Sequence, residues 1–150
     1  MIKKNIIILC LYFFLTNCGF EPIYLDKNNT TFSIEKIDYT GDRELNNFLK
    51  TNLNKYKNKK VDNKITIEVN SSYEKIILSK NAKGGMTNYQ IKVDVIFLIK
   101  PTNKKIEFNK QIIMNSMDDK FDEERYERSM KQNFADSISN RLPSELIINQ

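Results

Sequence analysis

Apolar and polar residues alternate along three consecutive segments in the middle of the chain. The clearest alternation covers residues 89–99, where every second side chain is apolar. The same pattern begins near Lys64 and near Ile106, and turn-forming sequences lie between the segments at 81–85 and 101–104. Period-two alternation is typical of strands with one buried face. The three segments are therefore expected to form an antiparallel meander whose other face is polar.

A strand and a helix are predicted before the meander. Residues 32–39 predict a strand, and the apolar parity changes between Ile34 and Ile37, which indicates a bulge or bend. Apolar residues then recur three or four positions apart over residues 42–58, as on an amphipathic helix. Asp42 stands where an N-cap is expected.

The C-terminal segment predicts a second helix, which begins after Asp118 and Asp119. Acidic residues occupy its predicted first turn, where the helix dipole favours anions. Pro143 is expected to end or kink it. Its apolar residues recur every fourth position, at Tyr126, Met130, Phe134, Ile138 and Leu142.

The element order β-α-β-β-β-α predicts an α+β fold. We expect a two-layer sandwich in which two helices cover one face of a four-stranded, mostly antiparallel sheet.

The N-terminus has the pattern of an export signal. Lys3 and Lys4 precede an apolar run at residues 6–15. A membrane-spanning helix needs roughly 20 apolar residues, so this run is too short to cross a bilayer. It fits the core of a signal peptide over residues 1–17.

The residues at the predicted cleavage site resemble the lipobox of bacterial lipoprotein precursors. Leu15, Thr16 and Cys18 match that pattern, whereas Asn17 is bulkier than the usual residue. The resemblance implies a diacylglycerol thioether on Cys18, cleavage before it and acylation of its amine; no other cofactor is expected. By the same resemblance, Gly19 after the cysteine favours release of the lipoprotein to the outer membrane. An uncleaved anchor and an ordinary secretory signal cut elsewhere are the alternatives.

Composition narrows the range of functions. Removing Lys3 and Lys4 from 24 basic residues leaves 22 against 19 acidic ones, which is too even for a nucleic-acid-binding face. The chain has no histidine, and its cysteines are Cys10 and Cys18. The folded part therefore offers neither an imidazole base nor a His/Cys metal site. We predict that the protein is not an enzyme, and we assign no catalytic or metal-binding residue.

The sequence from Cys18 to Tyr24, Cys-Gly-Phe-Glu-Pro-Ile-Tyr, resembles the mature start of the alphaproteobacterial-type LptE family. The predicted element order is also similar to that of this family. The resemblance implies a tether at 18–31 and an LptE-like domain at 32–150. It further implies a lipid-anchored protein on the periplasmic face of the outer membrane. Such a protein plugs the LptD barrel, assists its assembly and helps deliver lipopolysaccharide to the cell surface.

The sequence is also compatible with two other functions. The first is a lipid-binding carrier whose sheet and helices separate to hold an acyl chain. The second is a pilot lipoprotein that escorts a secretin.

Lysines near the predicted turn at 81–85 are candidates for lipopolysaccharide binding. The ammonium groups of Lys75, Lys80 and Lys83 are suited to lipid A phosphates, although three solvated lysines would give the same pattern. The turn itself, with Gly84 and Gly85, indicates a hairpin rather than a phosphate-binding loop.

Two further clusters have simpler explanations. The acidic residues at 118–124 indicate a helix start rather than a calcium site. The aromatic residues are expected in the core, with an acyl-binding groove as the alternative; they are Tyr73, Tyr89, Phe97 and Phe108.

Overall fold

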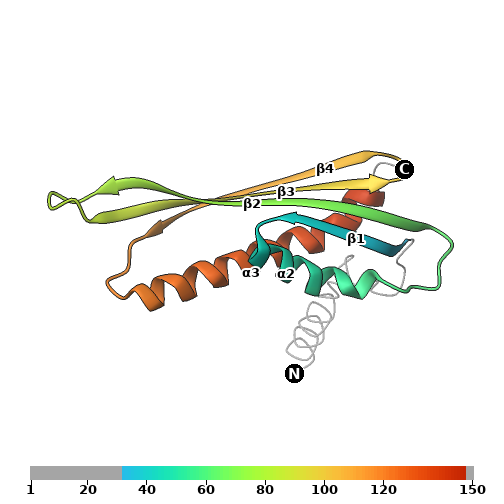
Figure 1. The fold of residues 1–150 in the computed structure, drawn as a ribbon, viewed down its shortest axis with the longest axis horizontal. Helices are drawn as coiled ribbons and strands as arrows, with labels where there is room; N and C mark the ends of the chain where they lie inside the picture. The colour runs from blue at the N-terminus through green and yellow to red at the C-terminus, as the bar shows by residue number, and fades with distance from the viewer. Residues whose placement is uncertain (1–31, 148–150) are drawn as a thin grey trace, which may run out of the picture.

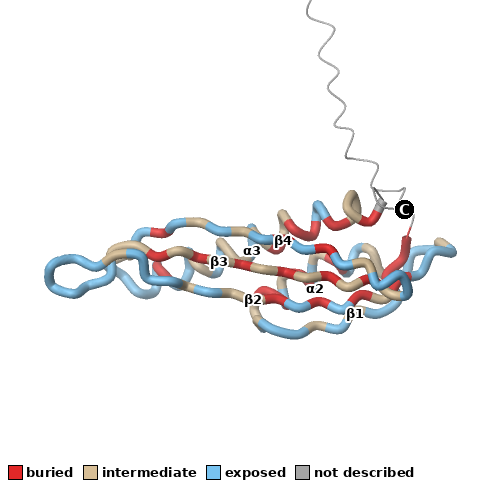
Figure 2. Tube along the Cα trace, turned by 90° about the horizontal axis from the view of Figure 1, so that it is seen from above, coloured by how far each residue is buried: buried red, intermediate tan, exposed pale blue. Residues whose placement is uncertain are grey.

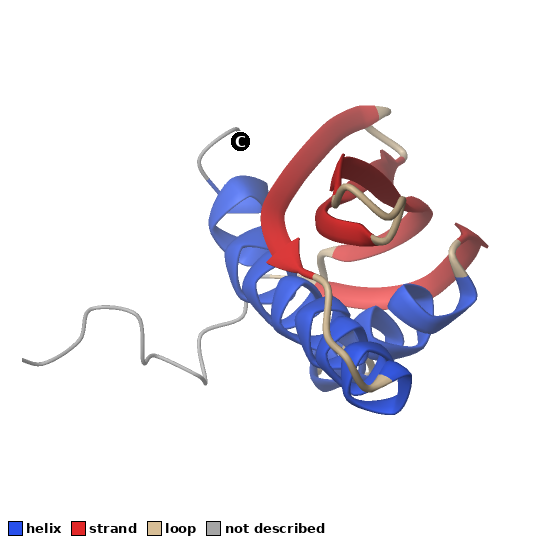
Figure 3. Cartoon of the chain, turned by 90° about the vertical axis from the view of Figure 1, so that its left-hand side faces the viewer, coloured by secondary structure: helices blue, strands red, loops and turns tan. Residues whose placement is uncertain are grey.

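A computed structural model describes residues 32–147 and has the predicted α+β architecture (Figure 1). Both helices lie on one side of a curved four-stranded sheet, which is clear when the molecule is viewed along its long axis (Figure 3). The elements are β1 (Ser33–Gly41), α2 (Arg43–Leu53), the short 3-10 helix η1 (Asn54–Tyr56), β2 (Lys64–Lys80), β3 (Met86–Lys100), β4 (Lys104–Asn115) and α3 (Lys120–Ile147). No helix among these elements is both long and apolar enough to cross a membrane.

The strands are ordered β1-β2-β3-β4. β1 runs parallel to β2 because α2 carries the chain back across the sheet between them, whereas β2, β3 and β4 are joined by hairpins and pair antiparallel. The predicted bulge in the first strand is confirmed, since the register shifts between Ile34 and Lys36. The predicted mostly antiparallel sheet is therefore correct.

β3 is the central strand of the meander and has the cleanest burial pattern. Its helix-facing side chains, from Tyr89 to Ile99 at every second position, are at most 3% exposed. The intervening side chains lie on the opposite face and are polar over Gln90–Asp94. Figure 2 shows the buried positions recurring along the strands, while the far end of the β2–β3 hairpin is exposed. The predicted one-sided sheet is thus present.

The first helix begins as expected but is shorter than expected. The carboxylate of Asp42 accepts a hydrogen bond from the backbone N–H of Leu45 at 2.7 Å, which confirms the predicted cap. The helix was predicted to reach residue 58, yet α2 ends at Leu53 and continues as η1. Lys57 forms a parallel bridge with Ile34, and this pairing with the sheet ends the helix.

The entry to α2 depends on Gly41, which has a φ of +96°. A Cβ at this position would lie 1.7 Å from the carbonyl oxygen of Ser71, so only glycine fits there. The N–H of Asp42 donates to the same oxygen at 3.0 Å, which fixes the start of α2 against β2.

Pro143 was expected to end or kink the second helix, and it does not end α3. The helix continues to Ile147 with the proline inside it. Leu142 and Leu146 lie on either side of the proline and are 1% and 8% exposed. A proline within a helix costs about 3 kcal/mol, and burial of each leucine contributes about 1.5–3 kcal/mol, so packing on the sheet outweighs the lost hydrogen bond.

The apolar stripe predicted on α3 is buried only in its second half. Ile138 and Leu142 are fully buried, but Tyr126 is 37% exposed. A spacing of four exceeds the helical repeat of 3.6, so the stripe turns by about 40° at each step. In the first half of the helix the residue that reaches the sheet is Glu123, which is 4% exposed.

Candidate functional site

The β2–β3 hairpin extends beyond the helices at one end of the molecule (Figure 1). We call residues 76–87 the hairpin tip. Four large apolar side chains are 41–48% exposed there: Ile76, Ile77, Leu78 and Met86. Because successive strand residues point to opposite faces, consecutive apolar residues at 76–78 make both faces of the tip apolar.

The turn at the end of the hairpin tip is well defined. The side-chain oxygen of Asn81 accepts hydrogen bonds from the backbone N–H groups of Lys83 and Gly85, at 3.0 and 2.8 Å. Gly84 has a φ of +81°, a conformation that glycine adopts without strain. The predicted hairpin turn is confirmed.

The hairpin tip is also positively charged. Lys80 and Lys83 are exposed, and the sequence contains no acidic residue between Glu74 and Asp94. A protruding surface that combines apolar side chains with unopposed ammonium groups is suited to an anionic amphiphile.

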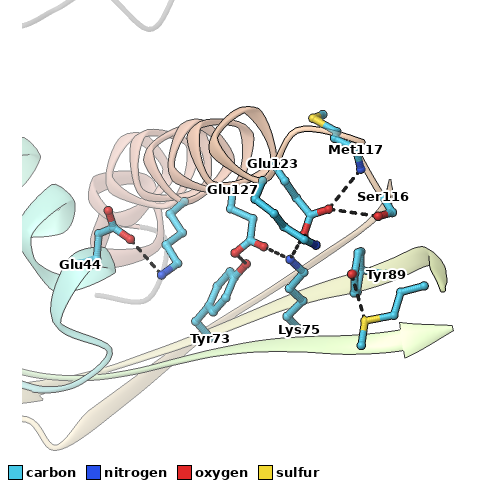
Figure 4. Close-up of polar contacts among 11 residues, drawn as sticks. Glu44, Tyr73, Lys75, Tyr89, Ser116, Met117, Glu123 and Glu127 are labelled. Atoms are coloured by element: carbon cyan, nitrogen blue, oxygen red, sulfur yellow. Dashed lines mark hydrogen bonds and ion pairs between the residues drawn. The ribbon is translucent and has the colours of Figure 1, made fainter. Parts of the chain in front are cut away.

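Lys75 lies apart from the other two lysines predicted to bind phosphate. Its ammonium group lies between the carboxylates of Glu123, at 2.8 Å, and Glu127 (Figure 4). It also lies 4.2 Å from the centre of the Tyr89 ring. We call Lys75, Glu123 and Glu127 the ionic clasp, because they join β2 to the first half of α3.

The contacts within the ionic clasp shift the pKa values of Glu123 and Lys75. Glu123 accepts from Lys75 and also from the hydroxyl of Ser116 and the backbone N–H of Met117, at 3.2 and 3.1 Å. The hydrogen bond from Lys75 is the largest influence, and together with these donors it lowers the pKa of Glu123 to about 2 although burial opposes this shift. Burial lowers the pKa of Lys75, but its hydrogen bonds to the two carboxylates outweigh this effect and raise the pKa.

A second charged contact extends the ionic clasp towards α2. Lys131 lies 3.0 Å from Glu44 and 3.6 Å from Asp42, and its ammonium group is 4.0 Å from the centre of the Tyr73 ring. The Tyr73 hydroxyl donates to Glu127 at 3.0 Å. Burial first, and then this carboxylate, raise the pKa of Tyr73. The first half of α3 is thus tied to both β2 and α2 by charged groups.

Two shallow hollows lie along the first half of α3, with volumes of about 330 and 650 Å³. Glu44 and Phe121 line the first, Tyr126 lines the second, and Arg125 and Arg128 line both. Charged groups dominate the lining, so neither hollow is the apolar cavity that a lipid carrier is expected to have.

The remaining predicted residues occupy structural positions. Asp119 caps α3, since its carboxylate accepts from the N–H of Phe121 at 2.7 Å. In the part of the chain that the structure describes, no group of acidic or sulfur side chains is arranged to hold a metal ion. Phe97 and Phe108 pack edge to face in the core, with ring centres 5.8 Å apart. Cys18, together with the predicted signal peptide and the predicted tether, lies outside the described residues.

The ionic clasp was not found by sequence reasoning, although two signals for it exist. Lys75 follows Ser71 and Tyr73 on the helix-facing side of β2, so its side chain points inward. Glu123 and Glu127 are four residues apart, hence on one face of α3. A lysine that points inward requires a carboxylate partner.

Solved structures share this fold. Rare lipoprotein B from Shewanella oneidensis superposes with a TM-score of 0.52 at 18% identity, over 75% of this chain and 97% of that one. Lipoprotein B from Nitrosomonas europaea gives a TM-score of 0.52 at 17% identity, over 79% and 89%. The chain has the lipoprotein B fold. No family model and no curated protein matches the sequence.

The lipoprotein B fold agrees with the fold expected from the LptE resemblance. The match spans nearly the whole Shewanella chain and three quarters of this one, so it concerns the fold as a whole rather than one local motif. At this level of identity the likeness concerns architecture.

Proposed function

We propose that this chain is an outer-membrane lipoprotein of the lipopolysaccharide-assembly type, anchored through Cys18 and without catalytic activity. In this proposal it assembles with and plugs an LptD-like barrel from the periplasmic face. It helps deliver lipopolysaccharide to the surface, and Lys80 and Lys83 contact lipid A phosphates. The observation that carries the proposal is the apolar, basic hairpin tip on a lipoprotein B fold.

The start of β1 and the hairpin tip lie at opposite ends of the molecule, which supports separate anchoring and ligand-binding ends. β1 begins beside Lys64 and the end of β3, whereas the hairpin tip lies at the other end of β3. A strand of 15 residues spans about 50 Å, so the start of β1, where the predicted tether joins the domain, is far from the hairpin tip. The tip is therefore free to meet a ligand that the anchoring end does not contact.

Polar residues on the outer face of the sheet support the proposed role as a barrel plug. Polar side chains of β3 and β4 meet on part of this face, where Lys92 pairs with Asp94 at 3.0 Å while Asn109 donates to Asp94. These contacts lower the pKa of Asp94, with the hydrogen bond from Asn109 as the largest cause. A paired polar patch of this kind is compatible with the polar interior of a membrane barrel.

Affinity purification from outer membranes in mild detergent tests the partner. We expect an LptD-like barrel to co-purify in equal amount. Recovery of a secretin instead would favour the pilot function and contradict the proposal.

The anchor and the ligand contact have separate tests. Cys18→Ala should abolish acyl labelling and move the protein off the membrane. Lys80→Glu with Lys83→Glu should weaken lipopolysaccharide binding, and Lys105→Glu at the opposite end of the sheet is the matched control. Undiminished labelling, or binding equal to that of the control, would contradict the corresponding part of the proposal.

A further inference from the structure

An apolar strip of the sheet lies next to the ionic clasp. Tyr89, Ile91 and Met114 are 3%, 0% and 2% exposed, and they share the helix-facing side. Ile91 is paired with Lys75 across β2 and β3, and Tyr89 is paired with Met114 across β3 and β4. A lysine ammonium group therefore lies at the edge of a continuous apolar surface.

The first half of α3, residues 120–131, covers this strip, and ion pairs hold this cover in place. Glu123 is the one buried side chain in Lys120–Lys131, a stretch that the structure describes in full. Lys75 and, at 3.6 Å, Lys120 are its ion-pair partners. The second half of α3, in contrast, buries Ala135, Ile138 and two leucines. An anion that binds Lys75 therefore competes with the contacts that hold the cover.

We propose that an anionic amphiphile with one phosphate and a single alkyl or acyl chain binds beneath the first half of α3. Its phosphate replaces Glu123 and Glu127 on Lys75, and its chain lies on Tyr89, Ile91 and Met114. This inference rests on the proposed function, since Lys75 lies on the same strand as Lys80 and closer to α3, so a lipid first held by Lys80 and Lys83 at the hairpin tip can move along β2 to Lys75. Lys75 then acts as the third phosphate-binding lysine, and it is available only when α3 has moved.

The exchange has a clear physical basis. A phosphate monoester carries a charge of about −1.5 to −2 near neutral pH and three acceptor oxygens, so it competes with the two carboxylates for one ammonium group. Movement of the cover exposes apolar surface, and an alkyl chain removes that surface from water again. A ligand with both parts binds the open state better than the closed one, which is the condition for shifting the equilibrium.

Hydrogen exchange measured by mass spectrometry tests the opening. The full chain is purified from membranes, held in phosphatidylcholine nanodiscs and titrated with dodecyl phosphate. We expect exchange at residues 120–131 to become about tenfold faster at saturation, with no change at residues 135–146. Binding without faster exchange at 120–131 would overturn the inference and leave the proposed function standing.

Two further probes separate the parts of the ligand. Inorganic phosphate lacks the chain, and dodecyl maltoside lacks the anion, so neither should open residues 120–131. Opening by inorganic phosphate to the same extent would overturn the role of Tyr89, Ile91 and Met114. Opening by dodecyl maltoside would overturn the role of Lys75.

Opposite substitutions in the ionic clasp distinguish a binding role from a purely structural one. Glu123→Gln with Glu127→Gln removes the competing charges and should tighten dodecyl phosphate binding about tenfold, whereas Lys75→Met should weaken it about tenfold. Circular dichroism confirms that each variant is folded. A structural role alone would change binding in the same direction in both variants, and that result would overturn the inference.

Substitution of the tip lysines separates this inference from the proposed function. Lys80→Ala with Lys83→Ala should weaken binding of lipid A vesicles, yet saturating dodecyl phosphate should still open residues 120–131. If the unsubstituted protein binds neither dodecyl phosphate nor lipid A vesicles, both the inference and the lipid contact of the proposed function are wrong.

Discussion

From Ala135 to Leu146, α3 packs on the sheet through buried apolar side chains, whereas from Lys120 to Lys131 it contacts the sheet mainly through the ionic clasp. Burial of apolar side chains stabilises the folded state in proportion to the apolar area removed from water, and dissolved charged molecules do not displace it. Ion pairs instead exchange attraction between the charges for their hydration, so their net stabilisation is small or variable. One helix thus has a firmly packed half and a half that other charged molecules can displace.

The difference teaches that the position of a helix and its stability have separate sources. The ionic clasp specifies where the first half of α3 lies, because Lys75 must stand within reach of two carboxylates. The apolar residues of the second half supply most of the free energy that holds the helix to the sheet. The following predictions test this division, beginning with the largest expected effect.

Leu142→Ala should lower the free energy of unfolding by about 2–5 kcal/mol, because it leaves a cavity at a position that is 1% exposed. Tyr126→Ala, on the same helix but 37% exposed, is the control and should change stability by less than about 1 kcal/mol. Urea denaturation measures both. Equal losses would contradict the assignment of stability to the second half.

Stability should depend on pH through Glu123. Its pKa falls from 4.5 to about 2 on folding, so the unfolded state binds more protons between these values and stability decreases as the pH falls from about 4.5 to 2. The full contribution is present above pH 4.5 and amounts to roughly 3 kcal/mol at most.

Glu123→Gln removes this contribution. The difference in unfolding free energy between the unsubstituted protein and the variant should therefore shrink as the pH is lowered through this window. Urea denaturation at a series of pH values measures it, and parallel pH profiles for the two proteins would show that the clasp does not titrate as described.

Lys75→Met should cost about 1–3 kcal/mol at neutral pH, because it leaves a buried carboxylate without its main partner. The pKa of Glu123 should rise in the variant, which carboxyl titration by NMR detects. Lys80→Met removes an exposed lysine from the same strand and should change stability by less than about 1 kcal/mol. Identical effects of the two substitutions would refute the special position of Lys75.

Salt should produce the smallest effect. Raising the ionic strength to 1 M shortens the Debye length to about 3 Å, which weakens the partly exposed pairs of Lys75 and Lys131. Amide exchange at residues 120–131 should become a few-fold faster, while exchange at 135–146 stays constant. A uniform change along α3 would remove the distinction between its halves.

Much of the fold follows from local pattern. The alternation at 89–99 has one solution that buries its apolar residues, and Asp42 satisfies the first free N–H groups of α2 wherever that helix packs. The hairpin turn is similarly local, since Asn81 and Gly84 supply its hydrogen bonds and its positive φ. The sequence shows that the hairpin tip contains apolar residues. It does not show that they are exposed, because exposure depends on where the helices stop covering the sheet.

Taken by itself, the amino-acid sequence determined the strands, the two helices, their order and the α+β class, because these depend on period, caps and turns within a few residues of each other. Tertiary structure decided that α2 ends at Leu53, where Lys57 joins the sheet, and that α3 continues through Pro143, where two leucines are buried. It also decided the partner of Lys75. A lysine is attracted to any nearby carboxylate, and only the packing of α3 across β2 brings Glu123 and Glu127, about 50 residues away in sequence, within hydrogen-bond distance of its ammonium group.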